Sequence, residues 1–317
     1  MEWTGPMFRY LALNDLDKDD LDTFFSFFKN DNLEAAKSYF NIVGYKPDHR
    51  LAYLLKTKQL YRSTPLTFND PFDCMVGIDP NAQDKDILAW YRRSFWCQAF
   101  EIEHWQEVLR KIGTEAAKRY LMEEAIETFM NVIHKAPIVK IVQRTLKKFV
   151  DQSRTICFSE NPDNLLMWAH YADKHEGYCL GFNSADLKGI NRLVGFYKVE
   201  YDSESDRRPL LMLSNGEASE LGLSKKIFLS KSRHWAYEKE IRLIYVNAEP
   251  YLKFNPIALR EIILGADMPS RLKTGFQFLM EAFTEWESLD HVTFSDAELD
   301  TTHFKVTTSP RRGLHEG

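Results

Sequence analysis

The sequence predicts an α+β fold with a mixed, mainly antiparallel sheet core and a helical insertion. The expected strands cluster along the chain instead of alternating regularly with helices, which argues against a doubly wound parallel sheet. Over residues 84–150 the pattern changes, because apolar residues recur every three or four positions, as in helices. Hydrophobic residues make up 44% of the 317 residues, which is ample for one core. We therefore expect a single domain, residues 1–317, with the helical insertion at 84–150 inside it.

The elements before the insertion follow from periodicity and from turn-forming residues. A short apolar run predicts a first strand at residues 7–11. Residues 15–43 predict two helices, because the apolar period is broken by Asn and Asp near position 31. Residues 49–59 predict another helix, and a short strand follows at 60–63. The Pro, Asn and Asp residues of 64–73 predict an ordered loop.

After the insertion the strand pattern returns. Residues 241–246, with the sequence IRLIYV, give the clearest strand of the chain. The other expected strands are 154–159, 178–182, 193–201, 259–265, 292–294 and 304–306. The expected helices are 167–172, 217–228 and 271–285.

Composition and motif searches exclude several classes of protein. A net charge of −5 argues against a globally basic nucleic-acid binder. The chain has no run of about 18 apolar residues and no basic, apolar leader, so we expect no membrane span and a cytoplasmic protein. The four cysteines are too widely spaced for a zinc ribbon, and the GxxxxGK, GxGxxG, GxSxG and HExxH motifs are missing from the sequence. We therefore expect no metal site.

Two segments place polar or aromatic side chains where a ligand could use them. Asn69 and Asp70 precede a proline, which restricts the backbone, and predict either a rigid ligand-binding loop or a turn capped by the Asx side chains. Trp168, His170 and Tyr171 combine an indole, an imidazole and a phenol within one helical stretch. Such rings suit stacking on a flat heteroaromatic ligand, and the alternative is a buried aromatic face with a satisfied histidine.

The third segment leads into the clearest strand. Glu238, Glu240 and Arg242 lie two residues apart, so a strand would place all three on one face. Glu240 and Arg242 are interleaved with apolar residues such as Ile241 and Leu243, so they lie next to buried positions. A charged row beside a core strand needs partners or a ligand. The alternative is a Glu–Arg pair on a solvated surface.

Five strings together resemble the bacterial family DUF2971 over nearly the whole chain, with the helical segment near 84–150 as the most variable part. The strings are FRYL, LYRSTPLTFNDPFDC, ICFSENPDNLLMWAHYADKHEGYCLGF, FLSKSRHWAYEKEIRL and REIILGADMP. FNDPFD, MWAHYA with GYCLGF, and WAYEKEIR are the specific parts of this combination. The family name states no function.

The order of these blocks also resembles the ADP-ribosyltransferase pattern, in which an Arg or His, a Ser, Thr or Tyr, and a Glu lie on successive strands. Arg9, Ser63 and Glu240 match those places, and Glu238 with Glu240 matches the family's Glu-x-Glu pair. Tyr171 or His170 is an alternative to Ser63, and Arg62 or Arg154 an alternative to Arg9.

This second resemblance implies an ADP-ribosyltransferase-like fold and a set of roles for individual residues. Glu240 would stabilise the oxocarbenium-like ribose, and Glu238 would act as general base toward the acceptor. Arg9 would hold the pyrophosphate, and Tyr10 and Tyr171 would stack on nicotinamide. The residues expected to contact NAD are Arg9, Tyr10, Ser63, Asn69, Asp70, Trp168, His170, Tyr171 and Arg242.

The implied function is ADP-ribosyl transfer with NAD as the substrate, in a toxin or an anti-phage defence effector. The acceptor would be a protein, RNA or DNA, and an antitoxin would be a further partner. Two other functions use the same pocket. One is an NAD glycohydrolase or nuclease, and the other is a non-catalytic ligand-sensing module of a defence system.

Overall fold

The computed structural model describes residues 3–74, 147, 150–187, 196–202, 227–246, 248–287 and 289–311. The chain divides into two compact units. The sheet unit comprises Met1–Thr64, Ser153–Val199 and His234–Gly317, and the second unit comprises Pro65–Gln152 and Glu200–Arg233. Nearly all of the predicted insertion at 84–150 lies outside the described residues. The single-domain expectation stays a prediction.

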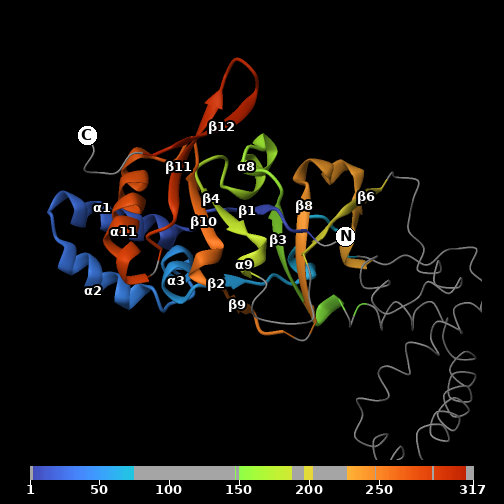
Figure 1. The fold of residues 1–317 in the computed structure, drawn as a ribbon, viewed down its shortest axis with the longest axis horizontal. Coiled ribbons are helices and arrows are strands. Elements are labelled where there is room, and N and C mark those ends of the chain that lie inside the picture. The colour runs from blue at the N-terminus through green and yellow to red at the C-terminus, as the bar shows by residue number, and fades with distance from the viewer. Residues whose placement is uncertain are drawn as a thin grey trace, which may run out of the picture. The chain divides into compact units, whose positions relative to one another are not determined.

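The sheet unit is built on an eight-stranded sheet in the order β12-β11-β10-β4-β1-β3-β8-β5 (Figure 1). Neighbouring strands run antiparallel except for β10 and β11, which are parallel. The strands are β1 (Pro6–Leu11), β3 (Ser153–Ser159), β4 (Tyr178–Asn183), β5 (Phe196–Lys198), β8 (Glu240–Val246), β10 (Leu259–Leu264), β11 (Thr293–Asp300) and β12 (Lys305–Pro310). The predicted mixed, mainly antiparallel sheet is confirmed.

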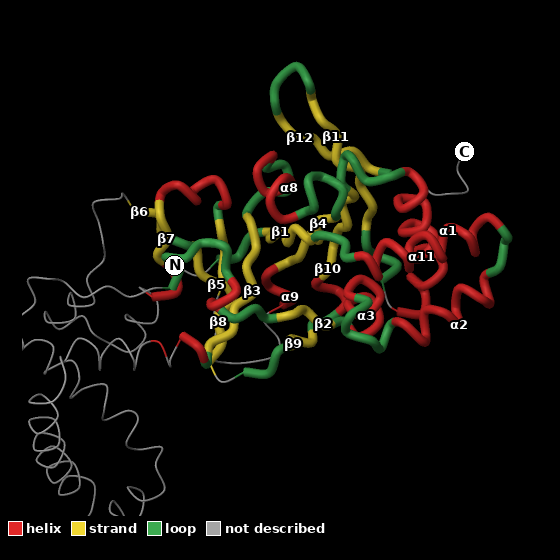
Figure 2. The backbone as a smooth tube through the Cα atoms, turned by 180° about the vertical axis from the view of Figure 1, so that it is seen from behind, coloured by secondary structure: helices red, strands yellow, loops and turns green. Residues whose placement is uncertain are grey.

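Helices and a small ribbon complete this unit. The helices are α1 (Asp15–Lys29), α2 (Leu33–Val43), α3 (Arg50–Thr57), α8 (Leu165–Tyr171), α9 (Ser184–Leu187) and α11 (Ser270–Glu287). Strands β2 (Gln59–Tyr61) and β9 (Tyr251–Lys253) form a two-stranded antiparallel ribbon, and η5 (Pro256–Ala258) follows it. Figure 2 shows α1, α2, α3 and α11 gathered at one end of the sheet. The two helices predicted within 15–43 are confirmed, and Asn14 caps the first through a capping box.

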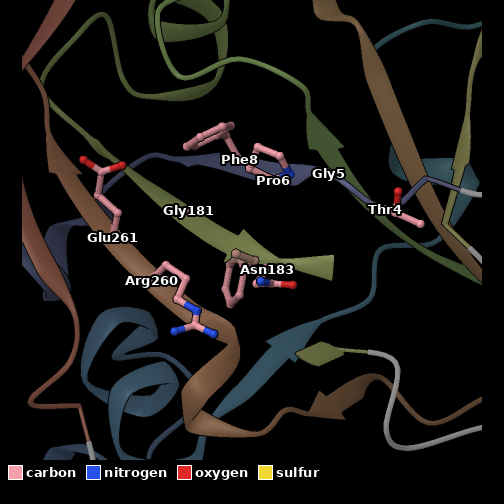
Figure 3. Close-up of a pocket in the computed structure, with 9 residues that line it drawn as sticks. Thr4, Gly5, Pro6, Phe8, Gly181, Asn183, Arg260 and Glu261 are labelled. Carbon is pink, nitrogen blue, oxygen red and sulfur yellow. The ribbon is translucent and has the colours of Figure 1, made fainter. Parts of the chain in front are cut away.

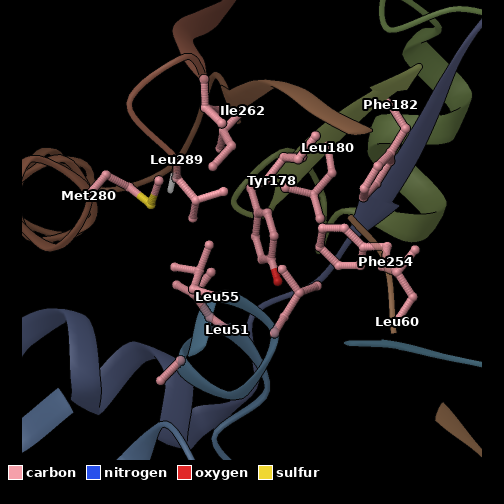
Figure 4. Close-up of a cluster of buried hydrophobic side chains, with 14 of the residues drawn as sticks. Leu51, Leu55, Leu60, Tyr178, Leu180, Phe182, Phe254, Ile262, Met280 and Leu289 are labelled. Carbon is pink, nitrogen blue, oxygen red and sulfur yellow. The ribbon is translucent and has the colours of Figure 1, made fainter. Parts of the chain in front are cut away.

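The main hydrophobic core lies between one face of the sheet and the helices α1, α3 and α11. Tyr178 and Leu180 of β4 meet Leu51 of α3 and Met280 of α11 there (Figure 4). A smaller cluster on the opposite face contains Tyr10, Trp168, Cys179 and Ile263 among other residues. Both faces of the central strands are therefore buried over part of their length.

The second unit contributes η1 (Pro65–Thr67) and the short parallel pair β6 (Glu200–Asp202) and β7 (Ser230–Ser232). Lys231 of β7 forms a buried ion pair with Asp73, with 3.5 Å between Nζ and Oδ2. The single strand predicted at 193–201 is wrong. The chain instead forms β5 and β6, which pair in different sheets on either side of Val199.

No helix among the described residues is long and apolar enough to cross a membrane.

Candidate active site

One row of paired residues crosses the middle of the sheet. Phe8 of β1 pairs with Ser159 of β3, and Ser159 pairs with Glu240 of β8. Residues directly opposite each other in neighbouring strands share a face, so these three side chains lie on one side of the sheet. Tyr10 and Arg242 lie two residues further along β1 and β8 and share that side. We call this side the α8 face, because helix α8 packs there against β1.

Glu240 and Arg242 form a buried, bidentate ion pair on the α8 face. Arg242 donates from Nε to Glu240 Oε1 and from Nη2 to Oε2, each over 2.8 Å. Arg242 is 0% and Glu240 5% exposed. The predicted common face of these two residues is confirmed, but the pair is buried and not on a solvated surface. Two charge-assisted hydrogen bonds fix the orientation of the carboxylate.

Glu238 reaches the site from a turn and not from the strand. It ends the 3-10 helix η4 (Arg233–Glu238), and Lys239, with a φ of 43°, turns the chain before β8 begins. The expectation that Glu238 continues the face of the strand is therefore wrong. The carboxylate of Glu238 is buried and accepts a 2.5 Å hydrogen bond from the Tyr171 hydroxyl. The hydroxyl of Ser159 donates to the Glu238 carbonyl over 2.7 Å, which ties η4 to β3.

Helix α8 is held in place by Asn164, its N-cap residue. The Asn164 amide oxygen accepts hydrogen bonds from the backbone N–H groups of Leu166 and Met167, over 3.0 and 3.2 Å. Its amide nitrogen donates to the carbonyl of Tyr237 in η4. Its backbone N–H donates to the hydroxyl of Tyr10 in β1 over 3.3 Å. One side chain thus connects the helix to the segment that carries Glu238.

Trp168 of α8 packs against Tyr10 of β1. Their rings meet edge to face with 5.2 Å between centroids, and both residues are buried. The Tyr10 hydroxyl donates to the Asn161 carbonyl over 2.7 Å, and the Trp168 indole donates to the Pro162 carbonyl over 2.8 Å. Burial raises the pKa of Tyr10 well above its ordinary value. Both side chains therefore pack the face, and their contact with NAD stays a prediction.

A second set of rings is open to solvent. His170 is exposed, and Tyr171, Trp235 and Tyr237 are half-buried. The ring centroid of Tyr237 lies 6.1 Å from that of His170 and 6.0 Å from that of Trp235. The ring of Tyr171 lies 6.5 Å from that of His170. These accessible rings beside Glu238 could stack on a flat ligand.

Three arginines were predicted as alternatives for binding the pyrophosphate of NAD, and all three lie away from the α8 face. Arg9 alternates along β1 with the residues of that face, so it lies on the opposite one, where desolvation lowers its pKa. Arg154 pairs with Tyr245 on this opposite face. The guanidinium of Arg62 lies 4.1 Å from the centre of the Tyr245 ring. Among the predicted site residues, the arginine that the structure brings to Glu240 is Arg242.

Ser63 does reach the sheet beside the α8 face. It forms an isolated antiparallel bridge with Thr155, and backbone hydrogen bonds of 2.8 and 2.9 Å join the two residues. Thr155 and Ser159 share a face of β3, four residues apart, which is about 13 Å along a strand. Ser63 therefore lies on the same side of the sheet as Glu240, but too far along the strand to contact the row formed by Phe8, Ser159 and Glu240.

Asn69 and Asp70 belong to the second unit. Asp70 is buried, and its Oδ1 accepts a 2.9 Å hydrogen bond from the backbone N–H of Phe72. This local bond is the Asx turn that the sequence offered as one alternative. A ligand-binding role for the loop stays a prediction.

Sequence analysis missed Ser159, Asn164 and Tyr237 as parts of the candidate site. The available signal for Asn164 was an Asx residue directly before an apolar helical stretch, which is typical of an N-cap. Ser159 ends a strand just before a proline turn, but nothing in the sequence pairs it with Glu238. Within the residues that the structure describes, no group of three or more His, Cys, Asp or Glu side chains could hold a metal ion.

Comparison with known proteins gives one finding for this site. Residues 167–243 match the family DUF2971, described as a protein of unknown function. The matched segment runs from α8 to the middle of β8, so it includes Tyr171, Glu238, Glu240 and Arg242. The resemblance to this family is confirmed over that segment. No curated protein and no solved structure matches the chain.

Proposed function

We propose that the chain is an NAD-dependent ADP-ribosyltransferase with an ADP-ribosyltransferase-like fold, and that its reaction takes place on the α8 face. The observation that carries the proposal is the Glu240 carboxylate, which is buried, oriented by Arg242 and adjacent to the turn that supplies Glu238. A preorganised charge in a water-poor site stabilises developing charge far better than a solvated one.

The proposed step breaks the glycosidic bond between nicotinamide and ribose. The bonding electron pair leaves with nicotinamide, and positive charge develops on the ribose C1 and ring oxygen, as in glycoside hydrolysis. Glu240 stabilises this charge and accepts a hydrogen bond from a ribose hydroxyl. A carboxylate oxygen has two acceptor positions, so it can bind Arg242 and the ribose together.

Glu238 is the proposed general base. The acceptor nucleophile forms the new bond to C1, and its proton passes to the Glu238 carboxylate. Tyr171 orients that carboxylate through the 2.5 Å hydrogen bond and is a positioning residue. The exposed ring of His170 and the half-buried ring of Tyr237 are the proposed stacking surface for nicotinamide.

The acceptor in this proposal is a protein, RNA or DNA, and the cellular role is that of a cytoplasmic toxin or anti-phage effector, with an antitoxin as its regulator. The supporting argument is the resemblance of the sequence to the ADP-ribosyltransferase pattern, with Glu238 and Glu240 as its Glu-x-Glu pair.

The test is to incubate the full chain with NAD labelled in the adenylate half and with separate protein, RNA and DNA fractions from host cells. Release of nicotinamide together with label on one fraction supports ADP-ribosyl transfer. Release of nicotinamide with all label in free ADP-ribose indicates a glycohydrolase instead. Intact NAD in every fraction contradicts the proposal.

The buried ion pair also favours a second function. Both oxygens of Glu240 accept from Arg242, which is the arrangement of a structural pair that neutralises two buried charges within β8. In that reading the aromatic surface binds a ligand without chemistry, as a sensing module. Saturable NAD binding, measured by calorimetry, without nicotinamide release would favour this second function.

A further inference from the structure

The surface over η4 and α8 combines accessible rings with basic groups. The ring centroid of Tyr237 lies 6.1 Å from that of His170 and 6.0 Å from that of Trp235. His170 is exposed, and the rings of Trp235 and Tyr237 are half-buried. His234 and Lys239 are exposed next to these rings in the chain. We call these five residues the η4 surface. The proposed function gives no role to Trp235, His234 or Lys239.

The geometry of a 3-10 helix places this surface next to Glu238. Side chains three residues apart in such a helix lie directly above one another. His234 therefore lies on the edge of η4 that carries Tyr237, and Trp235 lies on the edge that carries Glu238. A flat group resting on the indole of Trp235 would consequently lie beside the carboxylate of Glu238, the proposed general base.

The exposed charge of this surface is positive. Glu238 and Glu240 are buried, whereas Lys239 between them is exposed. Glu160, whose backbone N–H donates to the Lys239 carbonyl over 3.1 Å, forms an ion pair with Lys198 at 2.7 Å. Helix α8 contains no acidic residue. A negatively charged ligand therefore meets a favourable field here, whereas a basic side chain of a protein acceptor would meet Lys239 first.

An aromatic surface that carries basic groups matches the chemistry of a single-stranded nucleic acid. The bases of a single strand have accessible faces that stack on aromatic side chains, and its phosphates bind cations. A duplex hides these faces inside its own stack, so it can use the cations but not the rings. The net charge of −5 argues against a globally basic binder, but it does not describe this local surface.

The cavity on the same face of the sheet offers no alternative place for a base. It measures about 300 Å³ and lies across β1, β4 and β10 (Figure 3). The Phe8 ring and the Glu261 Cβ already lie 3.2 and 3.3 Å from the position that a Cβ on Gly181 would take. These side chains cover the strand there, so a base has no flat surface to rest on.

We propose that the η4 surface binds a single-stranded nucleic acid and that this strand is the acceptor of ADP-ribose. One base stacks on Trp235 beside Glu238, Lys239 and His234 contact the phosphates, and the neighbouring rings are left to nicotinamide. Nicotinamide leaves with the electron pair of its bond to ribose. A nitrogen or oxygen of the strand forms the new bond to C1 and passes its proton to Glu238. The acceptor role rests on the proposed function, whereas binding of the strand does not.

The experiment is fluorescence anisotropy of labelled oligonucleotides titrated with the full chain in the absence of NAD. Single-stranded DNA, single-stranded RNA and the duplex of each are compared. We expect a single strand to bind at least about tenfold more tightly than its duplex, because only the single strand can stack on the rings. The tighter of the two single strands shows whether the acceptor is DNA or RNA.

Two variants test the residues. Trp235→Ala removes the stacking surface and should weaken binding at least about fivefold. Lys239→Asn removes a cation, and asparagine tolerates the φ of 43° at this position. It should reduce the slope of log affinity against log salt by about 0.7.

The matched controls are Tyr61→Ala and Lys253→Asn, which also remove an exposed ring and an exposed cation. Both residues belong to the β2–β9 ribbon, which lies at the bottom of Figure 1, away from α8 at the top. Each control should leave binding of the single strand unchanged.

The outcomes separate this inference from the proposed function. If Trp235→Ala fails to fold, the salt slope of Lys239→Asn decides alone. Equal binding of single strand and duplex, unchanged binding by folded Trp235→Ala, an unchanged slope in Lys239→Asn, or no binding of either single strand overturns the inference. Strand binding without nicotinamide release from NAD leaves the binding site standing and contradicts only the proposed function. Transfer of ADP-ribose to a protein by a chain that binds no strand overturns the inference alone.

Discussion

Replacing Arg242 by Met should destabilise the sheet unit strongly, because it removes two charge-assisted hydrogen bonds from the buried carboxylate of Glu240. The pair is bidentate, with both nitrogen–oxygen distances at 2.8 Å, and Arg242 is completely buried. Removing one partner of a buried pair typically costs about 3–5 kcal/mol of unfolding free energy. Methionine keeps most of the apolar volume, so the loss of stability reports the lost ion pair and not a cavity.

The assay is urea unfolding followed by tryptophan fluorescence. The matched control is Arg271→Met, which removes a pair of the same chemistry, Arg271 with Asp22 at 2.7 Å, from an exposed position. Exposed pairs contribute about 1 kcal/mol at most. The double variant Glu240→Gln with Arg242→Met also removes the charge of the buried carboxylate and should recover part of the lost stability. If Arg242→Met costs no more than Arg271→Met, the pair does not hold the carboxylate as described.

Three further outcomes follow from single contacts. Gly265→Ala should prevent stable folding or sharply lower the Tm, because a Cβ there would overlap the carbonyl oxygen of His175, and thermal denaturation by circular dichroism checks this. Trp168→Ala should cost about 3–5 kcal/mol in urea unfolding, because the indole is completely buried, and a loss below about 1 kcal/mol would contradict its packing role. Burial and a 2.6 Å hydrogen bond to Asp20 raise the pKa of Tyr39 to about 12, above its unfolded value of about 10. The neutral phenol therefore stabilises the fold below about pH 10, and this stabilisation is lost as the pH rises through about 12. Tyr39→Phe should lack that loss, so parallel profiles of Tm against pH for the two proteins would refute the assignment.

Local patterns were sufficient for most strands and helices of the sheet unit. The strand expected at 241–246 appears as β8, extended by one residue to include Glu240, and the helix expected at 271–285 appears as α11. These elements have long, regular apolar periods, so their type follows from the residues alone. The split of 193–201 into two strands could not be predicted, because it depends on which strands are available as partners.

The candidate site was predicted in part. The alternation of Glu240 and Arg242 in a strand is a local property, and so it placed both residues on one face. Glu238 does not continue this alternation, because the positive φ of Lys239 turns the chain between Glu238 and β8. No local sequence pattern predicts this turn. The contact between Tyr171 and Glu238 joins residues 67 positions apart. Such contacts depend on how α8 is anchored, and the sequence carries no direct signal of them.

The placement of Arg9 on the face opposite Glu240 also depends on contacts between segments that are far apart in the sequence. A strand sends successive side chains to alternate faces, so the register of β1 against β3 decides whether Phe8 or Arg9 shares a face with Glu240. The pairing of Phe8 with Ser159 decides this in favour of Phe8. A one-residue shift would have brought Arg9 to the candidate site, and neither strand alone reveals which register forms.

The most direct test of the account is the rate of nicotinamide release from NAD by the wild type and by Glu240→Gln. The change keeps the shape of the side chain and removes its charge. Loss of one preorganised group of this kind lowers the rate by roughly 10²–10³. Asp296→Asn is the control, because it alters another Arg–carboxylate pair, with Arg311 at 2.9 Å, on the opposite face of the sheet. We predict the full fall in rate for Glu240→Gln and a near wild-type rate for Asp296→Asn. A folded Glu240→Gln protein that releases nicotinamide at the wild-type rate would contradict the account.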